Sequence, residues 1–179
     1  MDPITLLRHA AVKVLQTMAQ VHIKTAPPGI KPLRWQGNVT GAVLPFEGDM
    51  KGAMSIWFTD DMLNMVVTNL FGEGMKNDEG ARKDTAGEFL NMISGEFRRL
   101  LGGQGKTVQG GIPITTTQWP EAAEGQKAVV PFKTEAGAMI MEIEIGGTSA
   151  EELLASFAEG REVQAGKSES DKLVDKMFQ

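Results

Sequence analysis

The sequence of 179 residues contains no cysteine, only two histidines and no long apolar run. Without cysteine, a disulfide framework, a thiolate nucleophile and a cysteine-ligated zinc site are excluded. His9 and His22 have no acidic cluster at metal-ligand spacing, so we expect surface or core side chains rather than ligands or general bases. The longest apolar runs fall far short of the roughly 20 residues that cross a bilayer, and no signal peptide is recognisable at the start.

An excess of basic residues is also missing, because the formal net charge is −5. A general nucleic-acid-binding protein would show a basic face, so this class is disfavoured. The apolar fraction of 41% is ordinary for a globular domain, and the length fits one domain. We therefore expect a soluble cytoplasmic protein with neither a membrane nor a nucleic-acid partner.

The apolar pattern predicts an α+β fold, with an antiparallel sheet packed against two long helices. Helices are predicted over 3–22, about 60–71, 82–101 and 149–159. Strands are predicted over 38–46, 52–58, 107–118, 127–133 and 138–145. Each long helix leads into a proline-containing extended segment and then a hairpin, which predicts two helix–strand–strand halves related by a pseudo-two-fold axis.

The domain boundary is expected near residue 160. Residues 1–159 carry the apolar periodicity of the fold, whereas 160–179 are mostly polar. The second segment is therefore predicted to be a flexible C-terminal tail. Within the domain, the strand over 138–145 is predicted to begin buried on both faces and to end half exposed, because Glu142 and Glu144 alternate with isoleucines.

The helix over 82–101 carries the most informative surface. Its large apolar residues form one stripe, and Glu88, Asn91 and Gly95 fall together on the opposite face, with Asp84 before them and Arg98 beside them. A carboxylate and a carboxamide three positions apart are neighbours on a helix. A glycine inside a helix costs about 1 kcal/mol relative to alanine, and its missing side chain allows another molecule to approach closely. This face is a candidate working surface.

Two motifs also have structural interpretations. Thr85-Ala86-Gly87-Glu88 fits a capping box, in which Glu88 would only cap the start of the helix, while Asn77-Asp78-Glu79 offers an earlier start.

The run 102–107 resembles the end of a P-loop, but it lacks the first glycine of that motif and follows a helix rather than a strand. We interpret it as a loop that ends the helix. Met62, Met65, Met139 and Met141 are interpreted as core residues.

Glu88-Phe89-Leu90-Asn91, followed by Met92-Ile93-Ser94-Gly95, resembles the E-x-x-N-[MI]-[IV]-[AS]-G signature of the CheC/CheX/FliY family of chemotaxis phosphatases. The hairpin containing Gly48-Asp49-Met50-Lys51-Gly52 and the tripeptide Gly111-Ile112-Pro113 are similar to two further elements of that family. The first long helix has no second E-x-x-N. The chain therefore looks most like the CheX branch, which has a single motif.

The resemblance implies a phosphatase of two-component chemotaxis signalling that hydrolyses the aspartyl phosphate of a CheY-like response regulator. It implies that Asn91 positions the attacking water and that Glu88 pairs with the lysine of the regulator. Asp84, Gly95 and Arg98 would then contact the partner. The Mg²⁺ of such a reaction belongs to the regulator, so no metal or cofactor of the chain's own is expected. The resemblance also leaves a homodimer through sheet edges open.

Two other functions stay open. The chain could be a non-catalytic module of the same fold that binds a receiver domain or a flagellar-switch protein, with Glu88 and Asn91 as ordinary surface residues. It could also be an oligomerisation domain whose tail, 160–179, docks a partner. A small-molecule enzyme has the least support, because no acid–base pair, metal cluster or cofactor loop is found. Trp35, Trp57 and Trp119 have no assigned role.

Overall fold

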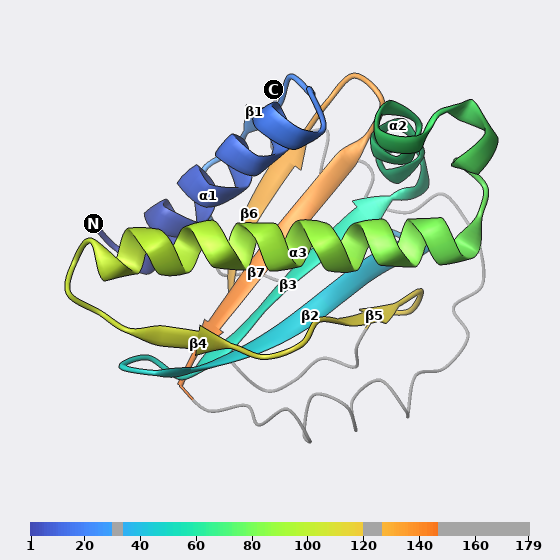
Figure 1. Cartoon of the computed structure of the whole chain (residues 1–179). Helices are drawn as coiled ribbons and strands as arrows, with labels where there is room; N and C mark the ends of the chain where they lie inside the picture. The colour runs from blue at the N-terminus through green and yellow to red at the C-terminus, as the bar shows by residue number, and fades with distance from the viewer. Residues whose placement is uncertain (30–33, 120–126, 147–179) are drawn as a thin grey trace.

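The computed structural model describes residues 1–29, 34–119 and 127–146, which form helices packed on an antiparallel sheet (Figure 1). The helices are α1 (Pro3–Met18), α2 (Asp60–Phe71) and α3 (Glu79–Gly102), with a short 3-10 turn η1 (Glu73–Met75). The strands are β1 (Lys24–Thr25), β2 (Val39–Gly48), β3 (Gly52–Thr59), β4 (Val108–Gly110), β5 (Ile114–Thr116), β6 (Ala128–Lys133) and β7 (Ala138–Ile145). The predicted α+β class is confirmed.

The sheet has the order β1-β6-β7-β3-β2-β4, and β5 also pairs with β2. The two hairpins, β2–β3 and β6–β7, meet where β3 pairs with β7. The short strand of the first half, β1, pairs with β6 of the second, and the short strands of the second half, β4 and β5, pair with β2 of the first. This reciprocal exchange of edge strands confirms the predicted pseudo-two-fold arrangement.

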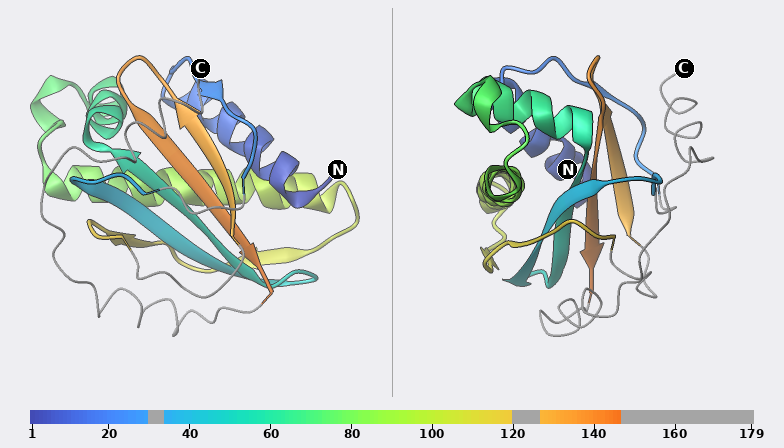
Figure 2. Two further views of the ribbon diagram at one scale, coloured as in Figure 1. Left: turned by 180° about the vertical axis from the view of Figure 1, so that it is seen from behind. Right: turned by 90° about the vertical axis from the view of Figure 1, so that its right-hand side faces the viewer.

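The three α-helices of the described residues cover the same face of the sheet, as the side view shows (Figure 2). Their apolar stripes and the inward residues of the strands form the main core. Phe89 and Phe97 of α3 are buried and meet Phe58 and Phe46, with ring centroids 6.5 and 6.3 Å apart. Burying each such ring contributes on the order of 1.5–3 kcal/mol. Of the methionines predicted for the core, Met62, Met139 and Met141 are buried, and Met65 is partly buried and packs against the core.

The opposite face of the sheet carries a second, smaller cluster that contains all three tryptophans. Trp35 and Trp57 are buried there, and the ring centroid of Trp119 lies 4.8 Å from each of theirs. Glu142 of β7 is also buried, and the half-exposed end predicted for this strand is confirmed at Glu144 and Ile145. The Glu142 carboxylate accepts hydrogen bonds from Arg34, from the Trp57 indole at 3.2 Å and from the Ser55 hydroxyl at 3.2 Å.

Three predicted boundaries were wrong. The helix predicted over 3–22 ends at Met18, because Gln20 takes a left-handed backbone conformation with φ of 53°. The helix predicted over 82–101 already begins at Glu79, where the Asp78 carboxylate caps the Ala81 N–H at 2.6 Å.

The predicted strand 107–118 is divided into β4 and β5. Between them, Pro113 offers no N–H for a ladder, and the Gly111 N–H donates to the Pro45 carbonyl at 2.8 Å. The predicted helix over 149–159 and the tail over 160–179 lie outside the described residues.

No helix within 1–29, 34–119 and 127–146 has the length and apolarity needed to span a membrane.

Glu96 connects α3 to α1 and makes the free energy of unfolding depend on pH in the acidic range. Its carboxylate accepts hydrogen bonds from Arg99 at 2.7 and 2.9 Å and from Lys13 at 3.0 Å. The Arg99 hydrogen bonds, followed by that from Lys13, lower the pKa of Glu96 from 4.5 to about 2, although burial opposes the shift. The folded-state pKa is depressed, so the contribution is complete above about pH 4.5 and is lost as the pH falls through 2.

We therefore expect Glu96→Gln to lower the free energy of unfolding at pH 7 by about 1 kcal/mol, since both partners are largely exposed and screened. In urea denaturation, the difference between wild type and variant should shrink steadily between pH 4.5 and 2. Glu79→Gln, which breaks an exposed pair with Lys83, serves as control and should have a smaller effect. A difference between wild type and Glu96→Gln that did not change with pH would contradict the assignment.

Candidate functional site

Helix α3 is held against the sheet by small residues on one of its sides. A Cβ on Gly87 would lie 3.1 Å from the Thr115 side chain of β5, and a Cβ on Gly110 of β4 would lie 3.2 Å from the Ser94 hydroxyl. Gly87 and Ser94 are seven residues apart, which places them on one helix face two turns apart. These close contacts fix the rotation of α3, so that Glu88 and Asn91 point away from the core.

The position of Thr85 decides between the two interpretations of Glu88. Thr85 is buried inside the helix, where its hydroxyl donates to the Ala81 carbonyl at 2.6 Å. Because the N-cap is Asp78, Glu88 lies in the helix interior, more than two turns from the start. The capping-box interpretation is therefore wrong, and Glu88 is not needed to cap α3.

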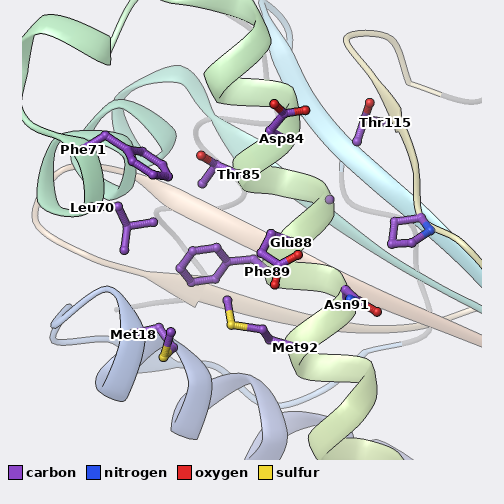
Figure 3. A pocket seen from close by; sticks show the side chains of 12 residues that line it. Met18, Leu70, Phe71, Asp84, Thr85, Glu88, Phe89, Asn91, Met92 and Thr115 are labelled. Carbon is purple, nitrogen blue, oxygen red and sulfur yellow. The ribbon is translucent and has the colours of Figure 1, made fainter.

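Glu88 and Asn91 are both exposed on α3 and line one hollow (Figure 3). Within the described part of the chain, neither side chain makes a hydrogen bond or an ion pair. Glu88 precedes Asn91 by three positions, so the two side chains are neighbours on the helix surface. Asp84 is also exposed and lines the same hollow. A free carboxylate and a free carboxamide on a rigid helix can bind a cation and orient a water, because the amide both donates and accepts.

The hollow is an open depression of about 710 Å³ that extends to both sides of α3. On one side it is lined by Met18, Leu70, Phe71 and Met92, and on the other by Pro113 and Thr115. Figure 3 shows Phe71, Leu70 and Met18 across the helix from Thr115. The polar residues of α3 therefore lie between two partly apolar sides.

Gly95 and Arg98, the other residues predicted to contact a partner, do not line this hollow. Arg98 is half buried, and its Nε donates to the Ser94 carbonyl at 3.3 Å. Its guanidinium carbon would lie 3.7 Å from a Cβ on Gly110, which places the group beside β4. The structure thus brings Asp84, Glu88 and Asn91 to one hollow and places Arg98 about two turns beyond Asn91 along the helix.

Several residues that line the hollow were missed from the sequence. Phe71 is 60% exposed at the last position of α2, and Met18 is 48% exposed at the last position of α1. A local signal existed for Phe71, because it directly precedes the helix-ending Gly72. Met18 gave no such signal, since it fits the apolar stripe of α1. Across the described residues, no group of three or more histidine or acidic side chains could hold a metal ion.

The sequence from residue 40 to residue 133 matches the family model for the chemotaxis phosphatase CheX. This range covers more than half of the chain and extends from the second residue of β2 to the last residue of β6, so it includes α2 and α3. The chain belongs to the CheX family. No curated protein matches the sequence.

Solved structures of CheX proteins agree with this assignment. A CheX from Desulfovibrio desulfuricans is 26% identical with a TM-score of 0.72, and the match covers 82% of this chain and 100% of that one. A CheX from Vibrio vulnificus is 25% identical with a TM-score of 0.71, at the same coverage. A CheX–CheY–BeF3–Mg²⁺ complex from Borrelia burgdorferi shares the fold, at 22% identity, a TM-score of 0.69, and coverage of 82% and 99%.

Ser94, at the [AS] position of the family signature, allows a direct test of the close packing between α3 and β4. Its hydroxyl is fully buried and has no hydrogen-bond partner among the described residues. Because an unpaired buried hydroxyl is costly, Ser94→Ala should raise the free energy of unfolding by about 1 kcal/mol. Ser94→Val should lower it by about 1–3 kcal/mol, because extra carbons would press on Gly110.

Urea denaturation of both Ser94 variants beside wild type measures these changes, and their opposite signs are the criterion. If alanine destabilised the protein as much as valine does, the Ser94 hydroxyl would have a hydrogen-bond partner, and the size of the side chain at this position would not determine stability.

Proposed function

We propose that this chain is a phosphatase for the aspartyl phosphate of a CheY-like receiver domain. Water attacks the phosphorus, the bond between phosphorus and the aspartyl oxygen breaks, and the products are inorganic phosphate and the free aspartate. Asn91 holds and orients the water in line with the bond that breaks. Glu88 pairs with the lysine of the receiver's active site and fixes the orientation of the two proteins.

The observation that carries the proposal is the pair of free side chains on α3. Glu88 and Asn91 are exposed, unpaired among the described residues, and open to one hollow. They have no structural task in the fold, since α3 is capped by Asp78 and held by its apolar face and small residues. In a family of chemotaxis phosphatases, free polar groups on such a rigid element are the best candidates for chemistry.

The chemistry needs little from the phosphatase. An acyl phosphate is already a good electrophile, and the receiver supplies its own Mg²⁺ and lysine, so the missing component is a positioned water. Positioning a reactant and excluding bulk water can lower a barrier by several kcal/mol. A carboxamide suits this task because it accepts one hydrogen bond from the water and donates another to the phosphoryl group or the metal ligands.

The identity of the partner is supported by a structural relative. A CheX protein from Borrelia burgdorferi has been solved in a complex with CheY, BeF3 and Mg²⁺, and this chain shares its fold over 82% of its length. We infer a receiver domain of the same type as the partner here.

The test is the rate of phosphate release from a receiver domain of the same organism, phosphorylated with acetyl phosphate in the presence of Mg²⁺. Addition of this protein in catalytic amounts should accelerate the release at least tenfold, with more than one turnover per molecule. Binding of the receiver without acceleration would instead assign a non-catalytic receiver-binding module, and the phosphatase proposal would be wrong.

A further inference from the structure

Large apolar side chains are exposed on both sides of Glu88 and Asn91. Ile112 is 84% exposed and Phe71 is 60% exposed, more than any other large apolar residue of the described chain except Met1. Exposed apolar side chains beside polar residues are a feature of protein-binding surfaces.

Phe71 lies on the side of α3 that faces α1 and α2. It lines the same hollow as Glu88, together with Leu70, Met18 and Met92 (Figure 3). Leu70 and Met92 are half buried and pack against the main core. The apolar residues beside Phe71 are therefore held in place by the core. Its ring is not part of that core, which leaves it available for contact with another molecule.

Ile112 lies on the opposite side, in the connection between β4 and β5. Gly110, just before this connection, lies against Ser94 and Arg98 of α3, and Pro113, just after Ile112, lies near Gly87 and lines the hollow. The connection therefore runs beside the part of α3 that carries Asn91. The Gly111 N–H is bonded to the Pro45 carbonyl at 2.8 Å, so the backbone that carries Ile112 is held in place.

We propose that Phe71 and Ile112 are apolar anchors for the docking of the phosphorylated receiver domain, one on each side of Glu88 and Asn91. This inference rests on the proposed function and extends it to the residues that determine affinity and partner choice. The partner it fits is a receiver domain that exposes apolar side chains on two sides of its phosphorylated aspartate.

The size of the surface favours the receiver as the occupant. A specific complex buries roughly 800 Å² on each partner, which Glu88 and Asn91 cannot supply alone. The contact must therefore extend over their surroundings. These include the apolar side of the hollow that carries Phe71 and, on the other side, Pro113, which lines the hollow and directly follows the exposed Ile112. Contact on both sides would also surround the attacking water, as residues around an interface centre exclude solvent.

The experiment measures the affinity of a receiver domain loaded with BeF3 and Mg²⁺, by titration calorimetry, for the full chain and for Phe71→Ser and Ile112→Ser. Each substitution should weaken binding about tenfold, as truncation of an interface anchor does. Ile145→Ser is the matched control, because Ile145 is 48% exposed at the end of β7, separated from β4 by β3 and β2. Its affinity should stay within about twofold of the wild type.

In the phosphate-release assay, both anchor variants should raise KM with kcat nearly unchanged, because neither side chain touches the reacting atoms. Binding of the loaded receiver without acceleration by the wild type would defeat the phosphatase proposal, while the affinity comparison would still decide the docking surface. Unchanged affinity in both variants, or no binding by the wild type, would overturn the docking proposal. A wild-type dimer that Ile112→Ser or Phe71→Ser dissociates would also overturn it.

Discussion

Asn91→Ala should abolish most of the acceleration of phosphate release while leaving affinity for the loaded receiver largely intact. The exposed Asn91 side chain has no partner in the described part of the fold, so its loss does not disturb the structure. The group that positions the attacking water is lost, and removal of one such group from an active site costs about 10²–10³-fold in kcat. The measurement is multiple-turnover phosphate release, with the affinity determined separately for the BeF3-loaded receiver.

Asn77→Ala provides the matched control, because Asn77 is also exposed but lies before the start of α3. The helix rises roughly 18 Å between its first residue, Glu79, and Asn91, at about 1.5 Å per residue. Asn77→Ala should therefore leave kcat and affinity unchanged. Both variants should unfold at the same urea concentration as the wild type, which separates a catalytic effect from a loss of fold.

Glu88→Ala completes the comparison, because its expected effect is on affinity and orientation. Removing the carboxylate deletes the charge that pairs with the receiver's lysine, so KM and the dissociation constant should rise more than kcat falls. Equal loss of affinity in Glu88→Ala and Asn91→Ala would contradict this division of roles. Full activity of Asn91→Ala would show that another group positions the water.

Residues near the centre of the fold were predictable from the sequence because local pattern and tertiary structure agree there. The apolar stripe of α3 buries Phe89 and Phe97, and the polar face that the stripe leaves behind carries Glu88 and Asn91. The earlier helix start at Asp78 was one of two alternatives that the sequence left open, and its capping hydrogen bond decides between them. Patterns confined to one element were therefore sufficient for the central helix and its exposed pair.

The sides of the hollow could not be predicted, because they depend on contacts between elements distant in sequence. Apart from the position of Phe71 directly before Gly72, the sequence does not distinguish Phe71 and Ile112, as exposed apolar residues, from residues of the core. The burial of Glu142 also depends on a distant contact, because the alternation within its strand predicts an exposed end but not the residue at which exposure begins. Glu142 is buried because Arg34, 108 positions away, covers it. The left-handed backbone at Gln20, which ends α1 early, also carried no residue-type signal.

Arg34→Met should be the most destabilising of the substitutions considered, because it leaves the Glu142 carboxylate buried without its cation. The Glu142 side chain is only 1% exposed, whereas Arg34 is 26% exposed and lies 4.6 Å from the Trp119 ring centroid. Removing one partner of a buried ion pair costs about 3–5 kcal/mol. We expect the lower end of this range, since Arg34 is partly hydrated, as a loss of unfolding free energy in urea.

The double variant Arg34→Met/Glu142→Gln separates the cost of the unpaired charge from the loss of packing on Trp119. A glutamine oxygen can still accept from the Trp57 indole and the Ser55 hydroxyl, which lie 3.2 Å from the carboxylate, but it carries no charge. The double variant should therefore be more stable than Arg34→Met alone, by about 1–2 kcal/mol. If it is less stable, Arg34 acts mainly through its contact with Trp119. The buried carboxylate would then be held by its neutral donors, and the second cluster would depend on the stacking of Arg34 rather than on its charge.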